Sequence, residues 1–167
     1  GSGADTIYGG TGRNQLFGND GADLIYTSAD GDLAGGGAGN DQIIAVAGTN
    51  RIFGGLGDDT ITGGVGRDVV SGGPGADVFL FASAAAIGIG AGRDMITDFT
   101  PGTDDIDLRA LGTAFNGAAG LLGGGAASFF YFAANGLLIG DENGDSVADW
   151  VLELTGAPAV GAADFLL

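Results

Sequence analysis

The sequence predicts an all-β fold, a parallel β-solenoid closed by a small antiparallel β cap, and two observations carry this prediction. The first is a nine-residue period, G-G-x-G-x-D-x-U-x with U apolar, that runs without a slip from Gly9 to Leu80. A fixed period of this kind is typical of stacked solenoids, because one repeat cannot bury its apolar face alone. The second is a group of aromatic and β-prone segments after residue 127, which favour paired strands.

Each nine-residue frame divides into a turn and a short strand. Glycines at the first, second and fourth positions permit backbone angles that other residues avoid, so six residues can reverse the chain. The last three residues, x-U-x, then form a strand whose apolar side chain points inward. Two frames close one coil of 18 residues, and coils stack at about 4.8 Å. The inward series is Ile7, Leu16, Ile25, Ala34, Ile43, Ile52, Ile61, Val70 and Phe79.

Stacking places the sixth residues of alternate frames above one another, in two columns. Carboxylates about 5 Å apart repel by roughly 3 kcal/mol at an effective dielectric constant near 20. A divalent cation between them makes the net electrostatic interaction attractive. Calcium fits better than magnesium, because it accepts six to eight oxygens, including main-chain carbonyls, in a forgiving geometry. The first column is Asp5, Asp23, Asp41, Asp59 and Asp77, and the second is Asn14, Asp32, Asn50 and Asp68.

The two columns are unequal in charge and in turn sequence. The first is all aspartate, whereas the second contains two asparagines and the degenerate turns TSADGD and AVAGTN. We therefore expect a well-occupied calcium row on the Asp5–Asp77 side and absent or weak sites on the other, where Asp32 is a weaker candidate. The turn carbonyls expected to complete the row belong to Gly3, Gly18, Gly21, Gly36, Gly37, Gly39, Gly54, Gly55, Gly57, Gly72, Gly73 and Gly75.

The repeat pattern fades between residues 81 and 110. Two fragments read as G-x-D-x-U, and the alternating order places Asp94 above Asp68 and Asp104 above Asp77. Each pair could hold one more calcium ion, or the two aspartates could simply cap turns. The full prediction is about five to six calcium ions, mostly on the Asp5–Asp77 side.

Residues 111–167 differ in texture and predict the cap. Residues 128–132 and 137–139 flank Asn135-Gly136, a strong two-residue hairpin signal, and residues 149–155 supply a third strand. Such a patch would protect the open end of the solenoid against edge pairing. The oxygen-bearing residues of the loop before the third strand are spaced as in a calcium-binding loop. The loop could instead be a plain turn with a bulge. Its weaker candidate ligands are Asp141, Asn143, Asp145 and Asp149.

Composition excludes several classes of function. The net charge is −16, and the five basic residues are all arginine, so the chain repels nucleic acid and anionic membranes. Without cysteine or histidine, a disulfide framework, His-liganded zinc and a Ser-His-Asp triad are impossible. No apolar stretch is long enough to span a membrane. Periodicity accounts for nearly every aspartate, so we expect no enzyme. Arg13, Arg51 and Arg67 could bind a polyanionic sugar or could screen neighbouring carboxylates.

The tandem nonamers resemble the RTX (repeats-in-toxin) calcium-binding domains of exported bacterial proteins. The segments GGPGADVFLF, DMITDFTPGTDDIDLRALG, GDENGDSVADWVLELTG and AADFLL resemble the C-terminal cap of serralysin-type proteases. This resemblance implies a right-handed parallel β-roll with calcium between its turns. It also implies type I secretion without a cleaved signal, and residues 164–167 fit the expected acidic and apolar terminus. The zinc site of serralysins belongs to another domain.

These inferences predict a three-part organisation and a function. We expect an RTX β-roll over residues 1–80, degenerate final turns over 81–110, and a cap over 111–167 that carries a type I secretion signal. The chain opens in mid-repeat, which suggests a fused N-terminal domain in a larger secreted or cell-surface protein. The predicted function is calcium-triggered folding and secretion. The alternatives are a structural or adhesive module of a surface layer or matrix protein, and an accessory anionic-polysaccharide-binding module, as in alginate epimerases.

Overall fold

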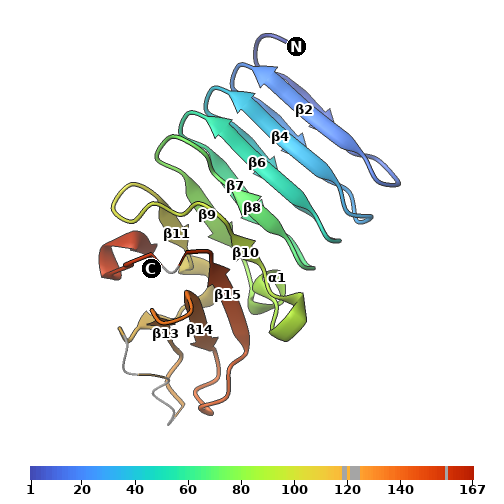
Figure 1. The fold of residues 1–167 in the computed structure, drawn as a ribbon. Helices are drawn as coiled ribbons and strands as arrows, with labels where there is room; N and C mark the ends of the chain where they lie inside the picture. The colour runs from blue at the N-terminus through green and yellow to red at the C-terminus, as the bar shows by residue number, and fades with distance from the viewer. Residues whose placement is uncertain (118–119, 121–124, 157) are drawn as a thin grey trace.

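A computed structural model of the chain describes residues 1–117, 120, 125–156 and 158–167. Within these ranges the regular secondary structure is almost entirely β, with strands stacked one above the other from the N-terminus toward the cap (Figure 1). The described helical segments are single turns: α1 (Ala84–Ile87) and three short 3-10 turns. None of them is long and apolar enough to cross a membrane. The predicted all-β solenoid is thus confirmed.

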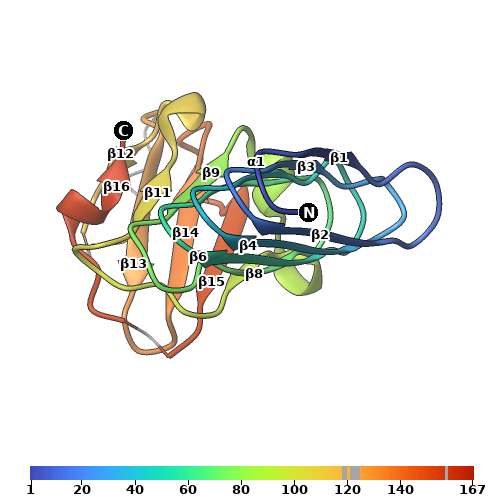
Figure 2. The same cartoon turned by 90° about the horizontal axis from the view of Figure 1, so that it is seen from above.

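Two sheets face each other across a thin apolar core (Figure 2). The first sheet consists of parallel strands in the order β1 (Thr6–Tyr8), β3 (Leu24–Tyr26), β5 (Gln42–Ile44), β7 (Thr60–Gly63), β9 (Val78–Phe81), β11 (Asp105–Asp107) and β16 (Phe165–Leu166). The second begins with the parallel strands β2 (Gln15–Asp20), β4 (Leu33–Ala38), β6 (Arg51–Leu56), β8 (Val69–Ser71) and β10 (Met95–Ile96).

The strand register confirms that two nine-residue frames make one coil. Ile7 pairs with Ile25 and Ile25 with Ile43, each 18 residues further along. In the second sheet Leu16 pairs with Ala34 in the same way. The predicted inward residues from Leu16 to Phe79 are all buried, whereas Ile7 is only partly buried at the open end of the roll.

Strand length differs from the prediction in the second sheet. The expected three-residue strands occur in β1, β3 and β5, but β2, β4 and β6 each extend over six residues. The extra length comes from main-chain pairing that continues into the glycine-rich turn, where Asn19 pairs with Gly37 and Gly37 with Gly55. This extension affects the hydrogen bonding of the neighbouring aspartates, as described below.

The cap is an antiparallel meander that continues both sheets of the roll. Strands β13 (Ser128–Phe132), β14 (Leu137–Asp141) and β15 (Trp150–Leu154) pair in sequence order, and the short β12 (Ala114–Phe115) lies beside β13. On its other side β15 pairs with β10, while β16 pairs with β11. The two-residue hairpin prediction was wrong: residues 133–136 form a four-residue loop, in which the N–H of Gly136 donates to Phe132 O at 3.1 Å.

Candidate metal centres

The aspartates of the first column form a continuous hydrogen-bonded ladder along one flank of the roll. In each step a main-chain N–H donates to Oδ1 of the aspartate one coil later. The donor and acceptor pairs are Asp5 to Asp23 at 2.7 Å, Asp23 to Asp41 and Asp41 to Asp59 at 2.8 Å, Asp59 to Asp77 at 2.9 Å, and Asp77 to Asp104 at 3.1 Å. Every member except Asp5 is buried.

The second carboxylate oxygen of four ladder residues has no hydrogen-bond partner among the residues that the structure describes. These buried atoms are Oδ2 of Asp23, Asp41, Asp59 and Asp77. A buried polar atom without a partner is costly, and a buried unpaired charge costs much more. In four successive coils, therefore, a proton or a bound cation at the equivalent oxygen would stabilise the folded chain.

A main-chain carbonyl from the next coil lies beside each of the first three of these oxygens. A Cβ placed on Gly36 would collide with Asp41 Oδ2 and lie 2.6 Å from the carbonyl oxygen of Gly54. Gly18 and Gly54 have the same surroundings, with Gly36 O and Gly72 O as the carbonyls. We call each of these three sites, at Gly18, Gly36 and Gly54, a cradle. Each cradle combines a carboxylate and a carbonyl oxygen, the ligand types that calcium prefers. Other predicted carbonyls, those of Gly3, Gly21, Gly37, Gly39, Gly55 and Gly57, face the glycine one coil further on.

Electrostatics in the ladder disfavour a bare negative charge. Burial raises the pKa of Asp59 to about 7, opposed by the hydrogen bond from Asp41 N–H and reinforced by the charges of Asp41 and Asp77. Burial likewise raises the pKa of Asp77 to about 6, and the pKa values of Asp41 and Asp104 also rise. Within the described residues no three His, Cys, Asp or Glu side chains converge on one point, so carbonyls would supply most ligands to a bound ion.

The C-terminal end of the ladder departs from the repeat. Asp104 stacks above Asp77 as predicted, but its Oδ2 accepts a hydrogen bond from Thr100 N–H at 2.8 Å. Sequence reasoning missed Asp98, which accepts from Gly72 N–H at 3.1 Å, from Gly73 N–H at 3.0 Å and from the Ser71 hydroxyl at 2.5 Å. Its charge adds to the raised pKa of Asp77 and Asp104. No repeat signal marks Asp98, because it lies outside the nine-residue frame.

The second column has the same main-chain ladder but different side-chain bonding. Main-chain N–H groups of Asn14, Asp32 and Asn50 donate to the side-chain Oδ1 of the residue one coil later, at 2.7 to 2.9 Å. Here, however, Oδ2 of Asp32 accepts from Ser28 N–H at 2.6 Å, and Oδ2 of Asp68 accepts from Gly64 N–H at 3.3 Å. Although burial acts to raise the pKa of Asp32, hydrogen bonds from Ser28 and Asn14 outweigh it and lower the value.

Asp94 is the exception on this flank. It stacks above Asp68 as predicted, and its Oδ1 accepts the Asp68 N–H at 2.7 Å. Its Oδ2 is buried and finds no hydrogen-bond partner in the described part of the chain. Burial raises the Asp94 pKa to about 9, with a further contribution from the charge of Asp68. The Asp68–Asp94 pair is therefore the one interval of the second column whose bonding matches that of the first.

The loop between β14 and β15 satisfies its own polar groups. Asp141 accepts from Gly144 N–H at 2.6 Å and from Ser146 N–H at 2.8 Å. The other weak candidates accept main-chain N–H groups of the same loop: Asn143 from Asp145, Asp145 from Val147, and Asp149 from Glu142. This bonding favours the plain turn over the calcium loop.

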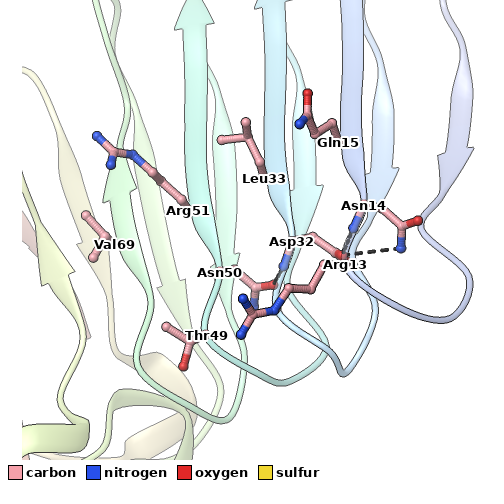
Figure 3. Close-up of a pocket in the computed structure, with 10 residues that line it drawn as sticks. Arg13, Asn14, Gln15, Asp32, Leu33, Thr49, Asn50, Arg51 and Val69 are labelled. Carbon is pink, nitrogen blue, oxygen red and sulfur yellow. Dashed lines mark hydrogen bonds between the residues drawn. The ribbon is translucent and has the colours of Figure 1, made fainter.

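A groove of about 470 Å³ crosses the second column on the side of β2, β4 and β6 (Figure 3). Arg13 and Arg51 line it, together with Gln15, Leu33 and Val69. Neither arginine forms an ion pair with a described carboxylate, in contrast to Arg93 with Glu153 and Arg109 with Asp107. The Arg51 guanidinium lies 5.4 Å from the centroid of the exposed Phe53 ring. The groove thus offers cationic groups in an otherwise acidic molecule.

Comparison with known proteins agrees with this geometry. The RTX calcium-binding nonapeptide repeat matches residues 1–34, 36–49 and 44–79, in four copies. The AlgE6R2 subunit of the Azotobacter vinelandii mannuronan C5-epimerase is similar in solution structure, with 27% identity and a TM-score of 0.50 over 96% of this chain and 91% of that one. The AlgE6R3 subunit of the same enzyme shows 29% identity and a TM-score of 0.43 over 99% and 80% of the two chains. No curated protein sequence matches.

Proposed function

Because residues 1–79 form a calcium-binding β-roll of RTX nonapeptide repeats, we propose that a row of calcium ions on the aspartate ladder triggers folding of the roll. The observation that carries this proposal is the set of unpartnered Oδ2 atoms on Asp23, Asp41, Asp59 and Asp77. Each is buried, and each of the first three lies beside a carbonyl of the next coil. A calcium ion would join these oxygens and neutralise the stacked carboxylates.

The energy available from such sites is large enough to control folding. Extracellular calcium modules have dissociation constants of about 10⁻⁴–10⁻³ M, and at tenfold excess each site stabilises the folded state by roughly 1.4 kcal/mol. Four ladder sites would contribute about 6 kcal/mol, which is comparable to the whole stability of a small domain. Without calcium the same carboxylates repel one another and must be desolvated.

This switch suits a secreted protein. In a cytosol poor in free calcium the chain would stay unfolded and could pass through a type I exporter, guided by its C-terminus, and it would fold outside the cell. Support for this step comes from the RTX repeat and from the resemblance of the tail to exported proteases. The module itself would be non-catalytic, and any activity would belong to a fused N-terminal domain.

Calcium titration followed by far-UV circular dichroism tests the folding switch, with magnesium as the control cation. The expected result is a cooperative gain of β-structure near millimolar calcium and none with magnesium, because magnesium holds its waters and requires a tight octahedron. A chain already folded in chelator would overturn the switch and leave calcium as a minor stabiliser.

A second candidate function is binding of an anionic polysaccharide. It is favoured by the groove that holds the unpaired Arg13 and Arg51, with Phe17 and Phe53 exposed on the neighbouring strands. A mannuronan C5-epimerase subunit is a structural relative, and a mannuronan-type polyuronate would offer carboxylates to the arginines and sugar faces to the rings. In calcium-saturated buffer, polymannuronate should bind the native chain but not the double variant Arg13→Ala/Arg51→Ala. The single variants Arg13→Ala and Arg51→Ala should each weaken binding, and Arg109→Ala, which removes the same charge outside the groove, is their control. Binding that survives the double substitution would exclude the groove.

A further inference from the structure

Two asparagine amides in the second column occupy a bridging position between coils. Asn50 Nδ2 donates to Asp68 Oδ1 in the next coil at 2.9 Å and to the carbonyl of Ala47 in its own turn at 3.0 Å. Asn14 Nδ2 does the same with Asp32 Oδ1 at 3.3 Å and with Gly12 O at 2.8 Å. Each amide therefore joins a carboxylate of one coil to a turn carbonyl of another, the two oxygen types that a calcium ion would join.

The carboxylates facing these amides keep no oxygen free for a metal. Oδ1 of Asp32 accepts the main-chain and side-chain N–H groups of Asn14, and its Oδ2 accepts Ser28 N–H. Asp68 repeats this arrangement with Asn50 and Gly64. Figure 3 shows Asp32 bonded between Asn14 and Asn50 along the column. Among the described residues, Asp23, Asp41, Asp59 and Asp77 of the first column have no donor at Oδ2.

The order of residues along the second column supports the same reading. Asparagine alternates with aspartate, so neighbouring carboxylates lie two coils apart, about 9.6 Å by strand spacing, instead of one. Asp68 and Asp94 are the one pair that stacks without an asparagine between them. There an unpartnered buried oxygen returns, at Asp94 Oδ2. Adjacent carboxylates and a free oxygen thus occur together at Asp94. Where an asparagine precedes the aspartate, the amide bonds Oδ1 and a main-chain N–H of the turn bonds Oδ2.

We propose that Asn14 and Asn50 take the place of calcium ions, so that the roll has one calcium-dependent flank and an opposite flank that hydrogen bonds alone hold together from Asn14 to Asp68. The choice between asparagine and aspartate at the sixth position of a frame then decides which flank responds to calcium. This inference rests on the proposed function in one respect, namely that the Asp23–Asp77 flank binds the ions.

The first test compares calcium stoichiometry in two matched variants by equilibrium dialysis. Asp32 and Asp41 hold the same position in their frames and are each 3% exposed. Asp41→Asn should lower the number of bound ions by at least one, whereas Asp32→Asn should leave both the number and the half-saturating concentration unchanged. Loss of an ion in Asp32→Asn would overturn the inference. A native chain that binds no calcium would instead overturn the proposed function.

The second test converts the amide flank. Asn50→Asp removes both bridging bonds and places four carboxylates in successive coils, at positions 32, 50, 68 and 94, so folding should require several-fold more calcium and the folded chain should bind one additional ion. Asn40→Asp is the control. It adds the same negative charge, but at an exposed turn residue that belongs to neither column. An Asn50→Asp variant with native stoichiometry and native calcium requirement would contradict the inference.

Discussion

Whether an aspartate of the roll has a free oxygen depends on the main-chain N–H four residues before it. In the second column that N–H is available in Ser28 and Gly64, and it donates to Asp32 and Asp68. In the first column the equivalent Gly55 N–H donates to Gly72 O, so Asp59 Oδ2 has no donor. The sequence predicts the columns, because they follow from the period. It does not predict which oxygens are free, because that depends on where each strand ends.

Substitution of Asp59 tests whether its carboxylate destabilises the calcium-free roll and stabilises the calcium-bound roll. Asp59→Asn removes a buried carboxylate whose neighbours are Asp41 and Asp77. We expect the variant to be more stable than the native chain without calcium, by about 1–2 kcal/mol, and less stable with saturating calcium. Urea unfolding in the two conditions measures both effects. An equal loss of stability in both conditions would show that the residue acts through packing alone.

The calcium-free chain should become less stable as pH rises. The folded pKa values of Asp77, Asp59 and Asp94 are raised to about 6, 7 and 9, above the ordinary value of 3.8. The folded state then holds more protons than the unfolded state, so its stability is fully present below about pH 4 and is lost as pH rises through these values. Thermal unfolding in metal-free buffers from pH 5 to 8 measures the trend. Calcium should reverse it, because ionised carboxylates bind the ion more tightly.

At the scale of elements, strand extension and the calcium cradle are linked. The six-residue strands β2, β4 and β6 carry main-chain pairing into the turn, and this brings Gly36 and Gly54 against the aspartate oxygens. Propensity favours the x-U-x segment as strand and glycine as turn. The observed strands override that expectation because the coils above and below supply partners for the glycine backbone. A pairing of this kind requires the stacked coils and is not encoded within one frame.

A methyl group in the cradle should remove one calcium site. Gly36→Ala would place Cβ against Asp41 Oδ2 and Gly54 O, so we expect loss of one bound ion and a destabilisation of about 1–3 kcal/mol in saturating calcium. Gly92→Ala is the matched control, since a Cβ there meets no atom within 4 Å. Stoichiometry by calorimetry and unfolding by urea together test this, and an unchanged ion count in Gly36→Ala would place the site elsewhere.

At the scale of the whole molecule, the cap and the roll share both sheets and one apolar core, and an ion pair joins them. The aromatic core of the cap includes Phe129, Trp150 and Phe165, and it is continuous with the core of the roll. An ion pair from Arg93 to Glu153, at 2.6 Å, joins the last turns of the roll to β15. The sequence predicts the cap strands from their aromatic and β-prone residues. It does not predict that β15 pairs with β10, because that contact joins segments far apart in the chain.

This continuity leads to the expectation that calcium removal unfolds roll and cap together. Trp150 is the single tryptophan; it is fully buried in the cap, so its fluorescence reports on the cap while far-UV circular dichroism is dominated by the roll. Without calcium the ladder carboxylates repel, the parallel strands from β2 to β10 separate, and β15 loses β10, the strand with which it pairs. The two signals should therefore change at the same calcium concentration. A Trp150 signal that persists after the β-signal is lost would instead establish residues 111–167 as an independently folding domain, onto which the calcium-bound coils stack.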